Sequence, residues 1–141
     1  MVAAIRSMLD TVFALAEERG GWLGPLVEGG KSHDPWSSYR FLTCLAQWWD
    51  LTHDARVPPA MFAFAKVYLG FLEAHPLNVM APQSFAGGQK DSFSQVRTEE
   101  AVLGFQWLLD HHGNSSSKSD LAAVNTLLWT LRREVFMRRQ N

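Results

Sequence analysis

The stretch from Gly20 to Trp36 gathers the side chains that are best suited to hold a small ligand. It contains two tryptophans, Trp22 and Trp36, together with His33 and Asp34, and it lies between two helix-like segments. A compact domain seldom spends about seventeen residues on an irregular connection without a functional reason. Tryptophan surfaces favour burial or ligand contact over disorder. We therefore expect this connection to form one wall of a binding site.

Each candidate in this stretch has a structural alternative. Trp22 could stack on a ligand ring or seal the connection onto the helices. Asp34 is first of all a helix cap, and a hydrogen bond to a ligand hydroxyl is the sharper alternative. His33 would need a positioned partner to act as a base, so a solvated loop histidine is favoured.

Polar residues near the starts of two later helices complete the candidate set. Arg40 follows Trp36 by one helical turn, and Glu100 follows Arg97 at similar spacing, so these pairs could contact a ligand. For Arg97 a salt link within or between helices is the favoured alternative. We assign no catalytic residue, because cleavage by two carboxylates requires a defined separation that the sequence does not fix. The available carboxylates at this end are Glu28, Asp34, Asp91 and Glu100.

Composition argues against several other classes of protein. The chain has 13 basic and 14 acidic residues in 141, so no overall field attracts nucleic acid or anionic lipid. The lone Cys44, which we expect to be buried, offers no thiolate metal site. His111 and His112 are adjacent, so they point about 100 degrees apart and more readily meet helix-end carbonyls than one metal. The arginines near the C-terminus are explained by the end of a helix, where the helix dipole favours positive charge. We predict no metal and no cofactor.

Hydrophobic periodicity predicts an all-α fold. A helix is expected over Val2–Glu18, stopped by two glycines, with Ile5, Met8, Leu9, Val12, Phe13 and Ala16 on its apolar face. Asp34 and Pro35 provide a cap and a first-turn proline for the second helix, which runs to about Asp50. Three further helices are expected over about Ala60–His75, Ser94–His111 and Asp120–Met137, the last preceded by a loose capping pattern of Ser117 and Asp120.

The connections between these helices alternate between long and short. In antiparallel helical hairpins this alternation brings both long connections to the same end. The segment around Trp22 and the one containing Gly87 and Gly88 should therefore share a rim. The first and last helices have one polar side, as outer helices should, whereas the third is apolar nearly all round although it should also be outer.

Several short motifs together resemble a known family. Their order and spacing are similar to the N-terminal part of glycoside hydrolase family 127, the beta-L-arabinofuranosidase-like proteins, over roughly Ile5 to Glu134. The motifs are the Gly-Gly helix end, Trp22-Leu23-Gly24-Pro25, Trp36 with Tyr39-Arg40, Arg97, Gln106-Trp107-Leu108-Leu109 and His111-His112.

The resemblance implies a partial α/α toroid, a six-hairpin glycosidase-like arc with a sugar site at the long-loop end. In the family the nucleophilic cysteine, its zinc-bound thiolate cluster and an acid/base glutamate lie in the portion that would follow Asn141. We therefore expect residues 1–141 to form a single helical domain that is a fragment of a larger α/α barrel. Such a fragment would carry substrate-wall residues and no hydrolytic activity of its own.

A second hypothesis treats the chain as a stand-alone helical interaction module. It would bind a protein partner or a second copy of itself through the apolar third helix. In either case we expect no signal peptide, no membrane span and a soluble, cytoplasmic chain, because Asp10 interrupts the first apolar run and no other run is long enough.

Overall fold

The computed structural model describes residues 2–25, 35–74 and 97–138, and these residues are helical with short connections. The helices are α1 (Val2–Glu18), α2 (Trp36–Thr52), α3 (Val57–Ala74), α5 (Thr98–His112), the short 3-10 helix η1 (Gly113–Ser115) and α6 (Lys118–Arg138). No strand occurs in the described ranges. The predicted all-α class is therefore confirmed. Within the same ranges, none of the helices combines the length and the apolar character that crossing a membrane requires.

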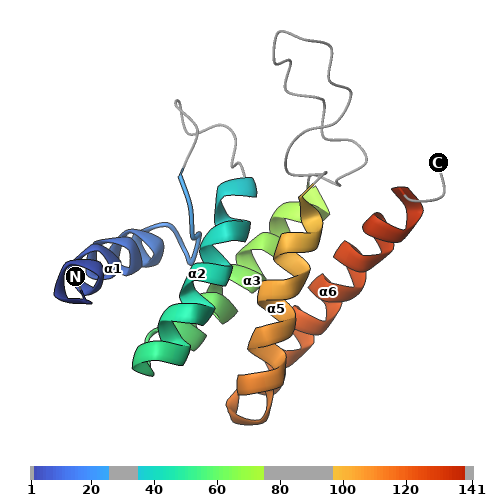
Figure 1. Cartoon of the computed structure of the whole chain (residues 1–141). Coiled ribbons are helices and arrows are strands. Elements are labelled where there is room, and N and C mark those ends of the chain that lie inside the picture. The colour runs from blue at the N-terminus through green and yellow to red at the C-terminus, as the bar shows by residue number, and fades with distance from the viewer. Residues whose placement is uncertain (1, 26–34, 75–96, 139–141) are drawn as a thin grey trace, which may run out of the picture.

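The helices form two hairpins that stand side by side (Figure 1). The first helices of the hairpins, α2 and α5, run in the same direction and pack extensively against each other. The second helices, α3 and α6, run the opposite way and also pack together. Gly104 of α5 permits the close approach of α2, because a Cβ atom at this position would lie 2.7 Å from Leu42 Cβ.

The starts of α2 and α5 lie at one end of the hairpins, and the short turns lie at the other (Figure 1). An ion pair between Arg40 of α2 and Glu100 of α5 links the two starts. The helices that flank the long connections are thus arranged as the long and short alternation predicts. Gly87 and Gly88 lie outside the described residues.

Helix α3 is more central than an outer helix should be. Its buried residues are Val57, Met61, Phe62, Phe64, Ala65, Tyr68 and Leu72. One side packs on α5 and α6, and Trp22 covers another, with ring centroids 5.3 Å from Phe64 and 5.5 Å from Phe71. This double coverage explains why α3 is apolar nearly all round. The helix begins at Val57 and not at Ala60, because Pro58 and Pro59 fit a first turn whose amides need no partner.

Helix α1 has the predicted bounds but packs less closely than predicted. Only Leu9 and Ala16 are buried in it, whereas Ile5 and Met8 of the expected apolar face remain 37% and 68% exposed. In Figure 1 this helix lies across the side of the hairpins and not along them.

Arg56 ties α1 to the turn between α2 and α3. Its guanidinium contacts Asp10 of α1 at 2.5 Å and Asp54 at 2.8 Å, and it lies 5.1 Å from the centre of the Phe13 ring. Trp48 Nε1 also donates to Asp54 over 3.1 Å. The hydrogen bonds from Arg56 are the main reason why the pKa of Asp54 lies well below its usual range.

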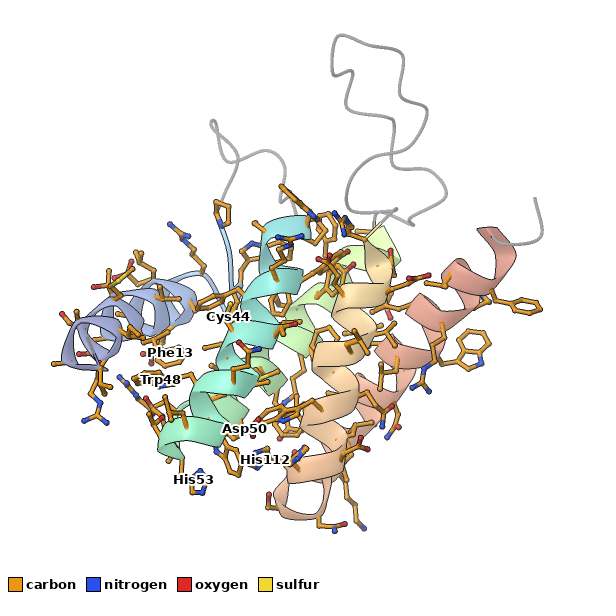
Figure 2. All side chains as sticks on the ribbon, viewed as in Figure 1. Phe13, Cys44, Trp48, Asp50, His53 and His112 are labelled. Atoms are coloured by element: carbon orange, nitrogen blue, oxygen red, sulfur yellow. The ribbon has the colours of Figure 1, made fainter. Side chains whose placement is uncertain are left out.

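Three further expectations need correction. Cys44 is exposed and not buried, and it lines an open groove between α1 and α2; Figure 2 labels its position on this helix. The fourth helix is described from Thr98 and extends to His112. The fifth begins two residues earlier than predicted, at Lys118, and its expected cap is present: the amide of Asp120 donates to Ser117 Oγ over 3.1 Å.

Candidate functional site

The predicted polar residues meet at the long-loop end. Glu100 Oε1 of α5 accepts a hydrogen bond over 2.9 Å from Nη1 of Arg97, the residue before this helix, and its Oε2 lies 3.6 Å from Arg40 Nε on α2. The Arg40 and Arg97 side chains are 64% and 44% exposed, while Glu100 is 23% exposed. Arg97 therefore has the salt link that was favoured for it. The cluster of Arg40, Arg97 and Glu100 could still offer charged donors to ligand hydroxyls.

Trp22 is not part of that cluster. It is only 2% exposed and packs edge-on against Phe64 and Tyr68 of α3, so it seals the 21–24 segment onto the hairpins. Of the two alternatives for this residue, sealing is the one that the fold shows. Gly21 permits this seal, because its backbone has a φ of 102° and lies against Ala63.

The start of α2 differs slightly from the prediction. Pro35 occupies the position before the helix, and its carbonyl accepts bonds from the amides of Ser38 and Tyr39. Trp36, the first residue of α2, is half-buried against the core. Asp34 lies outside the described residues, as do Glu28, His33 and Asp91.

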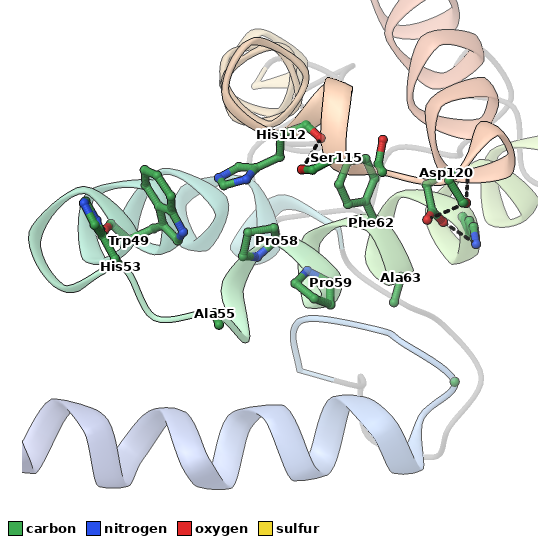
Figure 3. A pocket seen from close by; sticks show the side chains of 14 residues that line it. Trp49, His53, Ala55, Pro58, Pro59, Phe62, Ala63, His112, Ser115 and Asp120 are labelled. Carbon is green, nitrogen blue, oxygen red and sulfur yellow. Dashed lines mark hydrogen bonds and ion pairs between the residues drawn. The ribbon is translucent and has the colours of Figure 1, made fainter.

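A pocket also lies at the opposite, short-turn end of the hairpins. Its volume is about 660 Å³, and Figure 3 shows it between the end of α2, the start of α3 and the start of α6. Apolar residues that include Trp49, Pro58, Pro59 and Phe62 line one part of it, and polar residues that include Lys66, Asp120 and three serines line another. Sequence reasoning did not place a site here.

A cluster of two tryptophans and three histidines adjoins this pocket. Trp49 stacks on His53 with 4.6 Å between the ring centroids, and Trp107 stacks on His111 with 5.0 Å between them. His112 meets Trp49 edge-on at 4.5 Å. Figure 2 labels His53 and His112 at the short-turn end, and Trp49 contacts both rings. The spacing of four residues within each stacked pair is visible in the sequence, and this signal was missed.

Two histidines of the cluster bond to helix-end carbonyls: His53, and His111 as expected, whereas His112, for which the same contact was expected, has its Nε2 buried without a hydrogen bond among the described residues. His111 Nδ1 lies 2.9 Å from the Trp107 carbonyl, and His53 Nδ1 lies 2.9 Å from the Trp49 carbonyl. Burial and the neighbouring His111 lower the pKa of His112. Across the described ranges, no three His, Cys, Asp or Glu side chains come together in a way that could hold a metal ion.

Comparisons with known proteins identify no relative of this chain: no family model, no curated protein and no solved structure matches it.

Proposed function

We propose that this chain belongs to a carbohydrate-active protein of the six-hairpin type and supplies part of the wall of its sugar site. The proposal follows the sequence resemblance to the beta-L-arabinofuranosidase-like proteins. The observation that carries it is the meeting of Arg40, Arg97 and Glu100 where the parallel helices α2 and α5 begin. Partly exposed guanidinium and carboxylate groups are suitable partners for sugar hydroxyls.

The hairpin arrangement supports this proposal. In a toroid, the first helices of successive hairpins line the inside and the second helices lie outside. The packing of α2 on α5 and of α3 on α6 is compatible with such an arc. The long connections then begin and end beside the proposed sugar wall, where loops can add specificity.

The proposed role is binding and not cleavage. Glycoside hydrolysis uses two carboxyl groups about 5 to 10 Å apart across the scissile bond. The cluster of Arg40, Arg97 and Glu100 contains a single carboxylate, and both of its oxygens face guanidinium groups. We therefore expect no turnover of arabinofuranosides by residues 1–141.

Titration with L-arabinose and a methyl L-arabinofuranoside, followed by amide NMR, tests the proposal. We expect saturable shifts at residues 36–40 and 97–100, with dissociation constants of about 1 mM or weaker. Arg40→Ala should weaken binding by about threefold to tenfold through the loss of one charged hydrogen bond.

The matched control is Arg132→Ala. Arg132 of α6 is also exposed and also links two helices, because it donates a hydrogen bond to Gln106 of α5, but it is not part of the cluster of Arg40, Arg97 and Glu100. It should leave sugar binding unchanged. Shifts that avoid both helix starts, or equal effects of the two arginine variants, would contradict the proposed sugar wall. Hydrolysis of an aryl arabinofuranoside that is lost in Glu100→Gln would contradict the non-catalytic role.

A second candidate function is self-association, which exposed apolar side chains favour. The third helix cannot supply this surface, because the fold buries seven of its residues. The large apolar side chains that are exposed among the described residues lie on other helices. They are Val2, Ile5, Met8, Leu15, Leu51, Leu103, Trp129 and Phe136. Ile5 and Leu51 line the same groove of about 290 Å³ between α1 and α2, so this groove is the surface we propose for contact with a second copy.

A further inference from the structure

The pocket at the short-turn end has a polar side built by three consecutive serines. Ser115 Oγ donates to the His112 carbonyl over 3.0 Å, and Ser116 Oγ donates to the Gly113 carbonyl over 2.9 Å. Ser117 Oγ donates to Asp120 Oδ2 over 2.7 Å. A hydroxyl has one hydrogen and two lone pairs, so each serine has used its donor and retains acceptor capacity. This side of the pocket therefore suits a ligand that donates hydrogen bonds.

The charges around the pocket balance. Lys66 Nζ forms an ion pair with Asp120, so the ammonium and the carboxylate that line the pocket neutralise each other. Burial lowers the pKa of His112, which favours the uncharged form of its imidazole. A ligand with a net charge would have to compete with the Lys66–Asp120 pair, whereas an uncharged ligand would not.

The opposite side of the pocket is apolar and shaped by the start of α3. Pro58 and Pro59 present their rings there beside Phe62 (Figure 3). Such surfaces pack against the C–H face of a saturated ring. The volume of about 660 Å³ lies within the range that is usual for sites of small molecules.

From these three features we propose that the pocket binds an uncharged polyhydroxylated molecule of one or two rings, a mono- or disaccharide. Its hydroxyls would donate to the oxygens of Ser115, Ser116 and Ser117, and its apolar face would lie on Pro58, Pro59 and Phe62. This site is distinct from the sugar wall at the long-loop end, and it does not depend on that proposal.

NMR titration of the full chain with glucose, cellobiose and maltose tests this inference. Binding should shift the indole signal of Trp49 and the amides of residues 115–117, and it should saturate with a dissociation constant of about 1 mM or lower for at least one sugar. Glucose 6-phosphate should bind more weakly than glucose, because its charge competes with the Lys66–Asp120 pair. Absence of saturable shifts at these residues, or tighter binding of the phosphorylated sugar, would overturn the inference.

Matched variants separate a specific site from an unspecific effect. Ser115→Ala should weaken binding by about twofold to tenfold, because one acceptor is lost. Ser119→Ala removes an exposed serine in the first turn of α6 that does not line the pocket, and it should have no effect. Equal affinities of the Ser115 and Ser119 variants would contradict the serine contacts.

Arg40→Ala distinguishes this site from the proposed sugar wall. It should leave the shifts of residues 115–117 unchanged, even if it abolishes any binding at the long-loop end. Loss of both sets of shifts in this variant would show that the pocket is not an independent site.

Discussion

At the scale of single residues, the short-turn end concentrates the unusual chemistry of this chain. Five aromatic and imidazole rings, those of Trp49, His53, Trp107, His111 and His112, contact one another where α2 and α5 end. His112 Nε2 is buried, and it neither donates nor accepts a hydrogen bond within the described residues. A proton on His112 would therefore be poorly solvated, which makes its ionisation sensitive to folding.

His112 should make the stability of the protein depend on pH. Its pKa is lower in the folded protein than its ordinary value of 6.5, so the unfolded chain binds a proton more readily. The free energy of unfolding should consequently fall as the pH drops from about 7.5 through 6.5 towards the lower folded pKa. Urea denaturation at several pH values measures this slope.

Two variants identify the source of the slope. His112→Gln should flatten it, and His111→Gln should reduce it only partly, because burial is the larger cause and the charge of His111 the smaller. An unchanged slope in His112→Gln would show that another group dominates between about pH 7.5 and 5.5.

The sequence indicated only half of this cluster. The spacing of four residues between Trp49 and His53, and between Trp107 and His111, predicts that each pair shares a helix face. Contact between the pairs depends on how α2 and α5 are placed relative to each other, which periodicity does not determine. Trp22 was ambiguous for a similar reason: its type permits both stacking on a ligand and burial, and only the position of α3 decides between them.

At the scale of elements, the packing of α2 on α5 depends on a glycine. Replacing Gly104 with alanine would place a Cβ atom 2.7 Å from Leu42 Cβ, and both atoms lie close to backbone that cannot move freely. We expect Gly104→Ala to lower the free energy of unfolding by about 1 to 3 kcal/mol. Thermal and urea denaturation measure the loss.

Gly70 provides the control for this substitution. It also lies within a helix, α3, but a Cβ atom added to it would have open space around it, with no neighbouring atom within 4 Å. Gly70→Ala should raise stability by about 0.5 to 1 kcal/mol, because alanine favours the helix. If both variants behave alike, helix propensity and not the close approach of α2 and α5 governs position 104.

The helix bounds were largely predictable because their signals are local. Paired glycines end α1, and Ser117 with Asp120 begins α6. The burial of Cys44 was predicted wrongly, because apolar residues surround it in the sequence and the sequence does not show which side of α2 faces an open groove. The start of α3 was placed too late, because a proline pair can either precede a helix or fill its first turn.

At the scale of the whole molecule, the exposed apolar side chains predict association. Ile5 is 37% exposed and Leu51 is 74% exposed, and both line the groove between α1 and α2. Sedimentation velocity should show a monomer–dimer equilibrium at about 10 to 100 μM, the range of a weak interface. Leu51→Glu should shift this equilibrium to the monomer.

Leu103→Glu distinguishes this groove from other apolar positions. Leu103 of α5 is 69% exposed but does not line the groove, so its substitution should leave the association constant unchanged. A monomer at all concentrations, or an equal effect of the two variants, would contradict association through the groove.

The alternation of long and short connections predicted that α2 and α5 begin at the same end of the hairpins. This is the part of the architecture that was most predictable from the sequence. The alternation did not predict the double coverage of α3 or the pocket at the short-turn end, because both arise where three segments distant in the chain converge. Local patterns describe each helix, while a cavity depends on the gaps that several helices leave together.

The position of Arg56 has a consequence for how the molecule comes apart. This one guanidinium joins α1 to the α2–α3 turn through Asp10 and Asp54, while only two residues of α1 are buried. Salt weakens such exposed ion pairs but leaves the hairpin core intact. Rising ionic strength should therefore loosen the contact of α1 with the hairpins, and the amide hydrogens of α1 should exchange with solvent well before those of the hairpins.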